Sequence, residues 1–355
     1  MRLFRKLGKY FLFGFKTIFG NKAINLVILL LTFFITSYTT YRSITLQNKI
    51  NTIESKITAK SENYVKIEYS DIVNTDLEGA LGITNCLKTP LKKEELTTEL
   101  INVKNELENL FNENNLNFAF KYKDIYTGFS LSYNSSQDIF AASAIKAPEA
   151  IYIYEEAEKN NINLNETLTY TSNFYTEGTG VLKDTSPNKD YSIHELVKYS
   201  IINSDNIAHL MLNNKFKSSN IHSYWSNLGA SSIYKDNNAW GNINANDATI
   251  VMEELYKYYI NPNNKYSNEL INYFINSWKV ITNYNNNLKV ASKSGWSGTS
   301  LHDMALILDE NPYTLVILTN RGYVEYQDFF NKASDLVYQF HNLYWEEKMN
   351  YCINQ

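Results

Sequence analysis

The chain has 355 residues with 33 basic and 37 acidic side chains, enough for one large domain plus an extension, or for two domains. The formal net charge of −4 gives no general attraction to nucleic acid, so no nucleic-acid partner is expected. The two cysteines, Cys86 and Cys352, make neither a C-x-x-C pair nor a zinc spacing. They could pair in an oxidising compartment or stay free.

Residues 1–22 form a tail with basic side chains and no acidic ones, and residues 23–41 carry no charge at all. A membrane-spanning helix needs roughly 20 apolar residues, so 23–41 is predicted to be a transmembrane helix. The basic flank predicts a cytoplasmic N-terminus and an extracellular remainder. A cleaved signal peptide and a buried core helix are the alternatives. The long basic lead and the lack of a small-x-small cleavage site favour the uncleaved anchor.

Residues 42–90 are predicted to be a stalk or linker, because the isoleucines between 44 and 57 recur at helical spacing in a polar context. The globular domain is predicted to span 91–350. Within it, 95–111 has apolar residues three and four apart, which indicates a helix with one buried face. The runs 118–124 and 126–133 alternate around a glycine turn and predict a β-hairpin.

A helix follows from about Ser143, because Pro148 is acceptable only in the first turns of a helix. The remaining predicted elements are helices at 192–202 (with a capping box), 203–211, 246–259 and 327–347, and strands at 288–294, 304–309 and 315–319. Residues 295–300 are predicted to be a turn. This order predicts an α/β (α+β) fold, in which an antiparallel sheet is built from both ends of the domain and an all-helical subdomain is inserted.

Ser143 and Lys146 lie three residues apart at the start of the predicted helix, so they share one face. A free serine is a weak nucleophile and needs a base within hydrogen-bond reach, and a buried lysine can serve as that base. The same Ser-x-x-Lys spacing recurs at Ser186 and at Ser232, so the pattern alone does not identify the site.

Two further short motifs supply groups that an acyl-transfer site needs. In Ser204-Asp-Asn206, the serine hydroxyl can relay a proton to a leaving group and the asparagine can bond a substrate amide. In Lys293-Ser-Gly295, Lys293 adds positive potential and the Ser294 hydroxyl can bond a carboxylate. The glycine lets a substrate backbone lie close to the strand edge.

Together, in this order, the three motifs resemble the active-site serine β-lactamase and penicillin-binding protein superfamily. The resemblance covers roughly residues 91–347. It extends to the Tyr126-Thr-Gly hairpin, the Pro148 that follows Lys146, the Gly178-Thr-Gly-Val-Leu182 loop and the His302-Asp303 pair. It implies the class A β-lactamase-like fold, with a sheet flanked by helices and an inserted helical subdomain.

The resemblance also implies roles for the motif residues. Ser143 would be the acylated nucleophile, Lys146 its base, Ser204 the proton relay and Asn206 a substrate ligand.

On the predicted strand, Lys293 and Ser294 would hold the carboxylate end of the substrate beside Gly295. The backbone N–H groups of Ser143 and Trp296 would form the oxyanion hole. Asp205 is interpreted as structural.

The chain departs from the family pattern in three places. It has K-S-G where K-T-G is usual, which keeps the hydroxyl. Between Asn206 and Asp247 it has no glutamate to activate a deacylating water, and the only acid there is Asp236. The strand after K-S-G lacks a further basic residue, for which Arg321 is the only nearby substitute.

The favoured function is therefore a membrane-anchored, externally facing serine hydrolase or acyltransferase. Its substrate would be a D-alanyl cell-wall peptide or ester, and β-lactams would acylate it. A true β-lactamase and a degenerate wall-binding protein are the alternatives. The five histidines show no metal-ligand spacing and no nucleotide motif is present, so no metal and no cofactor are expected. The oligomeric state stays open.

Overall fold

The computed structural model describes residues 36–37, 40–45, 47–48, 65–70, 85–114, 117–282, 284, 288–320 and 327–354. The chain divides into two units, Met1–Tyr64 and Val65–Gln355. Residues 40–45 of the first unit are helical. No helix in the described part of the chain is long and apolar enough to cross a membrane. The predicted span 23–41 falls mostly outside the described residues.

The second unit is built on a six-stranded sheet with the order β1-β3-β2-β10-β9-β8, in which every neighbouring pair is antiparallel. The strands are β1 (Glu68–Ser70), β2 (Phe118–Asp124), β3 (Ser130–Tyr133), β8 (Lys289–Ser297), β9 (Ser300–Leu308) and β10 (Tyr313–Thr319). Strands from both ends of the domain thus share one sheet, as predicted. β8 is longer than predicted. It continues through Gly295 to Ser297, because Gly295 pairs with His302 and Trp296 with Leu301.

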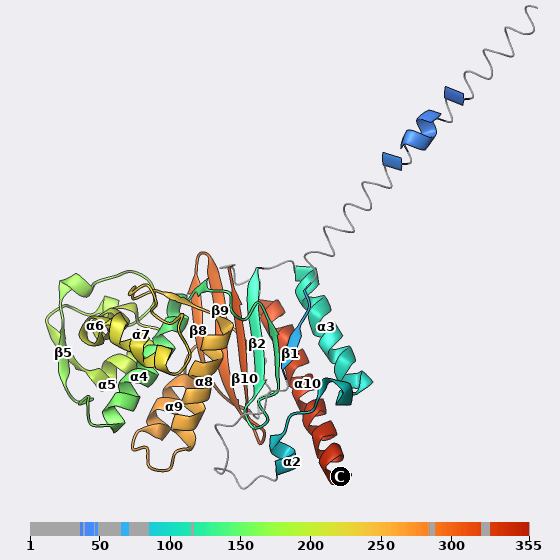
Figure 1. Cartoon of the computed structure of the whole chain (residues 1–355). Coiled ribbons are helices and arrows are strands. Elements are labelled where there is room, and N and C mark those ends of the chain that lie inside the picture. The colour runs from blue at the N-terminus through green and yellow to red at the C-terminus, as the bar shows by residue number, and fades with distance from the viewer. Residues whose placement is uncertain are drawn as a thin grey trace, which may run out of the picture. The chain divides into compact units, whose positions relative to one another are not determined.

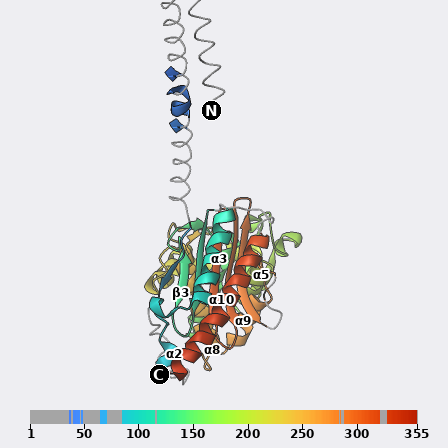
Figure 2. The same ribbon diagram turned by 90° about the vertical axis from the view of Figure 1, so that its right-hand side faces the viewer.

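Helices cover both faces of the sheet (Figure 1). One face carries α3 (Thr98–Asn114) and α10 (Gln327–Ile353), which pack against each other and run side by side in Figure 2. The other face carries α8 (Ala245–Ile260) and α9 (Ser267–Ile275). Two apolar cores, one on each side of the sheet, follow from this layering.

The inserted helical part lies beside β8 and β9 in Figure 1 and carries Ser143, Lys146 and the Ser204-Asp-Asn206 motif. Its elements are η3 (Ala142–Ile145), α4 (Lys146–Glu158), α5 (Ile193–Ile202), α6 (Asn206–Phe216) and α7 (Ser218–Asn227). Shorter pieces are α2 (Asn85–Lys88), η2 (Lys93–Glu95), β4 (Ile139–Phe140), β5 (Thr167–Tyr170), η4 (Ser172–Phe174), η5 (Leu182–Asp184), β6 (Lys189–Ser192) and β7 (Asn242–Ile243). The predicted capping box is present, because Ser192 and Glu195 exchange hydrogen bonds at the start of α5.

The compact unit begins at Val65, well before the predicted boundary at residue 91. Val65 and Ile67 are buried in the α3–α10 core, and the Glu108 carboxylate accepts the Ile67 N–H at 2.7 Å. β1 adds an edge strand to β3. A three-residue strand is too short to show a period in sequence, so this part of the predicted linker was not recognised as part of the domain.

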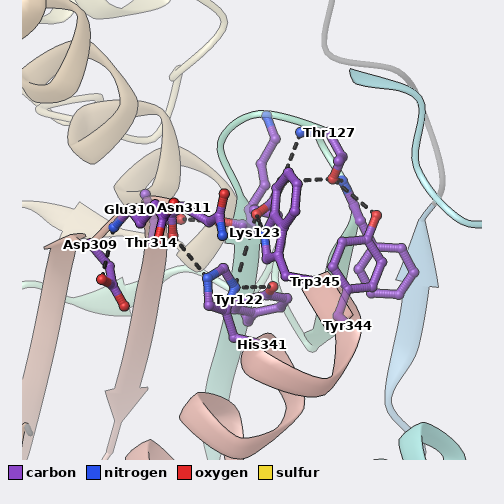
Figure 3. A network of polar contacts seen from close by, with 12 residues as sticks. Tyr122, Lys123, Thr127, Asp309, Glu310, Asn311, Thr314, His341, Tyr344 and Trp345 are labelled. Carbon is purple, nitrogen blue, oxygen red and sulfur yellow. Dashed lines mark hydrogen bonds and ion pairs between the residues drawn. The ribbon is translucent and has the colours of Figure 1, made fainter. Parts of the chain in front are cut away.

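A buried polar network fastens α10 to the β2–β3 hairpin (Figure 3). The Asp124 carboxylate accepts the Thr127 N–H and hydroxyl at 2.7 Å each and the Trp345 indole N–H at 2.8 Å. Burial raises the pKa of Asp124 to about 6. The Tyr122 hydroxyl lies 2.8 Å from His341 Nδ1. These contacts fix α10 against the face of the sheet that lies away from the helical subdomain.

A disulfide joins Cys86 of α2 to Cys352 near the end of α10, across 266 residues of sequence. The sequence left open whether these cysteines pair, because spacing alone carries no information about contact. A cross-link over so long a loop stabilises the folded state mainly by restricting the unfolded chain.

Reduction of this disulfide is expected to destabilise the protein. Removing a long-loop disulfide costs typically ~2–4 kcal/mol, which for a domain of this size lowers Tm by roughly 5–10 °C. Thermal unfolding with and without reductant measures the loss. The variants Cys86→Ser and Cys352→Ser should each match the reduced protein and lose their response to reductant. Equal Tm values for the oxidised and reduced protein would contradict the expectation.

Candidate active site

Ser143 lies in η3, immediately before α4, and only 9 % of its surface is exposed. Lys146 is the first residue of α4 and is fully buried. Its Nζ lies 3.1 Å from Ser143 Oγ, so the expected serine–lysine contact is present. The other two Ser-x-x-Lys serines lie elsewhere: Ser186 is exposed, and Ser232 is buried with its hydroxyl accepting the Asn244 N–H.

The Lys146 amine is held from two further sides. Its Nζ lies 2.7 Å from the Ser204 carbonyl oxygen and 2.7 Å from Asn206 Oδ1. Burial, followed by the neighbouring Lys293 charge, places the pKa of Lys146 well below its ordinary value of 10.5. A lowered pKa increases the neutral fraction of the amine at any given pH, and only the neutral amine can accept a proton.

The Ser204-Asp-Asn206 motif forms the turn into α6. Ser204 has a φ of +50°, a left-handed conformation that directs its hydroxyl to the site. Asp205 is the N-cap of α6: its carboxylate accepts the Ala208 N–H at 2.9 Å, and also the Val181 and Leu182 N–H groups at 2.6 and 2.7 Å. The structural interpretation of Asp205 is therefore confirmed.

The Gly178-Thr179-Gly180 loop closes over this turn. Gly178 has a φ of +108°, and a Cβ there would lie 2.6 Å from the Asn206 side-chain nitrogen. The Thr179 hydroxyl donates to the Ser204 carbonyl at 2.7 Å. The family resemblance included this loop but assigned no role to Thr179. The Gly-x-Gly spacing was the available signal, since only glycine allows this close approach.

Lys293, on β8, completes the cluster from the opposite side. Its Nζ lies 3.1 Å from Ser204 Oγ, which is also 3.4 Å from Lys146 Nζ. Burial lowers the pKa of Lys293 to about 7. The Ser204 hydroxyl thus lies between two lysines, a position suited to passing a proton.

Ser294 lies on the other face of β8. It is buried, its hydroxyl accepts the Val280 N–H at 3.1 Å, and it pairs across the sheet with Asp303. Successive residues of a strand point to opposite faces, so Lys293 and Ser294 cannot both face the cleft from an ideal strand. Carboxylate binding by the Ser294 hydroxyl, which the resemblance implies, stays a prediction and would require this hydroxyl to leave its buried partners.

Gly295 brings β8 against the turn that carries Ser143. A Cβ at this position would lie 2.7 Å from the Ala141 carbonyl oxygen and 2.9 Å from the Ala144 nitrogen. Both are backbone atoms and cannot move aside cheaply. The close approach places the neighbouring Trp296 on the same strand edge as the serine turn.

We expect Gly295→Ala to push β8 away from Ser143 and to lower the acylation rate by about 10²–10³-fold, the loss typical of a damaged oxyanion hole. The rate of covalent labelling by a penicillin measures the effect. Gly298→Ala is the matched control, because a Cβ at Gly298 meets no atom within 4 Å. Equal labelling rates for the two variants would argue against the role of this close approach.

A cleft of about 340 Å³ opens above the serine. Its lining residues are Phe140, Ala142, Ser143, Gly178, Thr179, Asn206, Trp240, Trp296 and Ser297. Three of the lining residues are aromatic, and one of them, Trp296, is 51 % exposed. The aromatic walls favour a ligand with flat or apolar groups on either side of the reacting bond.

The loop after α7 supplies Trp240 to this cleft and no carboxylate. In the described segment 207–246 the only acid is Asp236, which is exposed. The other nearby acids are engaged: Asp205 caps α6, and Glu149 is paired with His209. Arg321, the predicted substitute for a missing basic residue, lies outside the described residues.

Comparisons with known proteins identify the family and the fold of this chain. The model of the beta-lactamase enzyme family matches residues 102–341. No curated protein sequence matches the chain. The structure of PBP-A is similar at a TM-score of 0.61 with 19 % identity, over 70 % of this chain and 97 % of that one.

A PBP-A variant, solved as an acyl-enzyme complex with penicillin G, aligns at a TM-score of 0.61 with 19 % identity, over 70 % of this chain and 99 % of that one. A β-lactamase from Chitinophaga pinensis aligns at 0.59 with 14 % identity, over 67 % and 98 % of the two chains. At these identities the structural likeness shows the fold, which is the class A β-lactamase-like fold. The family match covers more than half of the sequence, and the chain belongs to the beta-lactamase enzyme family.

Proposed function

We propose that this protein is an extracytoplasmic active-site serine hydrolase or acyltransferase that forms an acyl-enzyme on Ser143. Its substrate would be a D-alanyl cell-wall peptide or a related ester, and β-lactams would acylate the same serine. The observation that carries the proposal is how Lys146 is held. Two carbonyl-type oxygens, from Ser204 and Asn206, accept two of its hydrogens. When the amine is neutral, its lone pair is left facing Ser143 Oγ at 3.1 Å.

Each proton transfer then has a defined partner. Lys146 takes the proton of Ser143 as Oγ attacks the carbonyl carbon and the C–N or C–O bond weakens. The Ser204 hydroxyl, which lies between Lys146 and Lys293, then gives its proton to the leaving group as the C–N or C–O bond breaks. It takes a proton back from Lys146, whose amine becomes neutral again. Lys293 attracts the carboxylate end of the substrate, and Asn206 binds its amide.

The absence of a carboxylate at the cleft among residues 207–246 favours slow deacylation by water. True β-lactamase activity is the second candidate, and the similarity to β-lactamase structures favours it. It would require another group to activate water.

Intact mass of the full chain, followed over time with a penicillin, separates these functions. A Ser143 adduct that lasts many minutes supports the acyltransferase or peptidase. A transient adduct with accumulating opened penicillin supports the β-lactamase. No adduct at any time contradicts both and leaves the wall-binding alternative.

The membrane-anchored, extracellular placement is part of the same proposal. It is supported by the basic tail, by the uncharged run 23–41 and by the Cys86–Cys352 disulfide, since disulfides persist in oxidising compartments. Protease added to intact cells should cut the C-terminal unit. Survival of this unit while a known surface protein is degraded would overturn the topology.

A further inference from the structure

A buried acid–base pair lies directly behind Lys146 and has no part in the mechanism above. Glu149 is one helical turn after Lys146 on α4, and His209 is on α6. Glu149 Oε2 lies 2.8 Å from His209 Nδ1, and the two side chains are 1 % and 0 % exposed. His209 Nε2 lies 3.0 Å from the Ala239 carbonyl oxygen. The pair therefore connects the catalytic helix to the loop after α7.

The hydrogen-bond partners of His209 and Glu149 determine how many hydrogens the pair holds. A carbonyl oxygen only accepts, so His209 Nε2 carries a hydrogen. The short contact between Nδ1 and the Glu149 carboxyl needs one more hydrogen, on either atom. The pair is then imidazolium with carboxylate, or neutral imidazole with carboxylic acid. The pair as a whole carries no net charge in either form, although a Glu149 carboxylate within it favours protonated Lys146.

The loop held by His209 places an indole against the lysine. The Trp240 ring lies 4.7 Å from the His209 ring, and Lys146 Nζ lies 5.3 Å from the Trp240 ring centroid. Two further hydrogen bonds hold the loop: the backbone N–H of Trp240 donates to Asn238 Oδ1 at 3.1 Å, and the Gly241 carbonyl accepts the Ala141 N–H at 3.0 Å. Trp240 also lines the cleft beside Ser143.

We propose that Glu149 and His209 are positioning residues that hold Trp240 over Lys146, and that this indole keeps water away from the lysine. In class A enzymes the corresponding stretch carries the glutamate that activates water, whereas in this chain it carries an apolar ring. The indole, held in this position, thus favours a neutral Lys146 for acylation and keeps water away from the acyl-enzyme. The catalytic role of this arrangement depends on the proposed function, whereas the pKa measurement that tests it does not.

The charged groups around Lys146 come from three elements. Lys293 on β8 favours the neutral amine, whereas Asp205 before α6 and Glu149 on α4 favour the protonated one. Removal of the indole leaves these charges in place but has two opposing effects. It admits water to Lys146, and it removes a ring face that favours the protonated amine. We expect the gain of water to be the larger effect. Loss of Trp240 should therefore raise the pKa of Lys146, because burial is the first cause of its lowering.

The test is a pH titration of Lys146 in the full chain, followed by NMR of ε-¹³C-labelled lysine and assigned by the resonance missing in Lys146→Arg. We expect Trp240→Ala to raise the pKa of Lys146 by at least one unit, a tenfold shift in its protonation equilibrium. Trp240→Phe, which keeps an aromatic face, should restore most of the difference. Trp278→Ala is the matched control, because Trp278 is 53 % exposed and lies outside the cleft lining.

His209→Leu tests the positioning step. It should produce a shift similar to that of Trp240→Ala, and the double variant should shift no further, since both remove the same ring contact. Glu149→Gln can still donate to His209 Nδ1 and so keeps the ring contact, and it removes an acid that favours protonated Lys146. It should therefore not raise the Lys146 pKa. An additional shift in the double variant overturns the positioning role of His209.

An unchanged Lys146 pKa in Trp240→Ala overturns the proposal as a whole. This readout needs no acylation, so its failure is distinct from failure of the proposed function, which would appear as an unlabelled Ser143 in the wild-type protein. In a wild-type protein that is labelled, the adduct of Trp240→Ala should also be lost severalfold faster. An adduct of unchanged lifetime overturns the claim that the indole withholds water from the acyl-enzyme.

Discussion

Replacement of Ser143 by alanine is expected to abolish covalent labelling by penicillins, which is the largest effect we predict. The Ser143 hydroxyl lines the cleft and lies 3.1 Å from Lys146 Nζ, and burial lowers the pKa of that lysine. Intact mass after incubation with a penicillin checks the result. The folded state should be unaffected, because the side chain loses one oxygen at the edge of the cleft.

Two serines provide matched controls for this prediction. Ser186 and Ser232 have the same Ser-x-x-Lys spacing, but one is exposed and the other is buried beneath Asn244. Ser186→Ala and Ser232→Ala should both be labelled like the wild type. Labelling that survives in Ser143→Ala would overturn the assignment of the nucleophile.

Replacement of Lys146 by alanine is expected to slow acylation by about 10²–10⁴-fold, the usual contribution of a positioned general base. In the wild type the acylation rate should rise with pH as Lys146 loses its proton, with a midpoint well below 10.5 because burial lowers its pKa. Loss of this rising limb in Lys146→Ala, measured with a penicillin between pH 5 and 10, is the diagnostic result. An identical pH profile in the variant would exclude Lys146 as the base.

The alkaline side of the same profile tests Lys293. Its pKa is about 7, lowered by burial, so its positive charge is lost as the pH rises through that value. Acylation by a substrate with a carboxylate should then fall above neutral pH, giving a bell-shaped profile. An ester without a carboxylate should show only the rising limb. The same alkaline decline with both substrates would mean that Lys293 does not act through the carboxylate.

Several features could be predicted from the sequence because they are local. The spacing of apolar residues located α3, the β2–β3 hairpin and the three C-terminal strands, each within a few residues. The placement of Ser143 and Lys146 on one face followed from their separation of three and from Pro148. The domain boundary was placed too late because the local signal at Val65–Ser70 is short. The buried position of the Ser294 hydroxyl could not be predicted either, because one residue decides which face of a strand a side chain occupies.

The site itself is a product of tertiary structure. Ser204 and Asn206 lie 58 and 60 residues from Lys146, and Lys293 lies 89 residues from Ser204, yet all meet within hydrogen-bond distance. The Ser-x-x-Lys pattern occurs three times, so sequence order singled out Ser143 only through the resemblance that all three motifs carry together. Burial gives the physical reason for that selection, because desolvation is what lowers the pKa of Lys146 and allows it to act as a base.

The sequence by itself thus determined the types of elements, their order and the inventory of reactive groups, since these depend on neighbours along the chain. Only the tertiary structure decided that Cys86 pairs with Cys352, that Ser294 faces away from the cleft, and that His209 and Trp240 support Lys146. The physical reason is common to all three: each depends on contacts between segments far apart in sequence, where packing determines which groups lose water and meet.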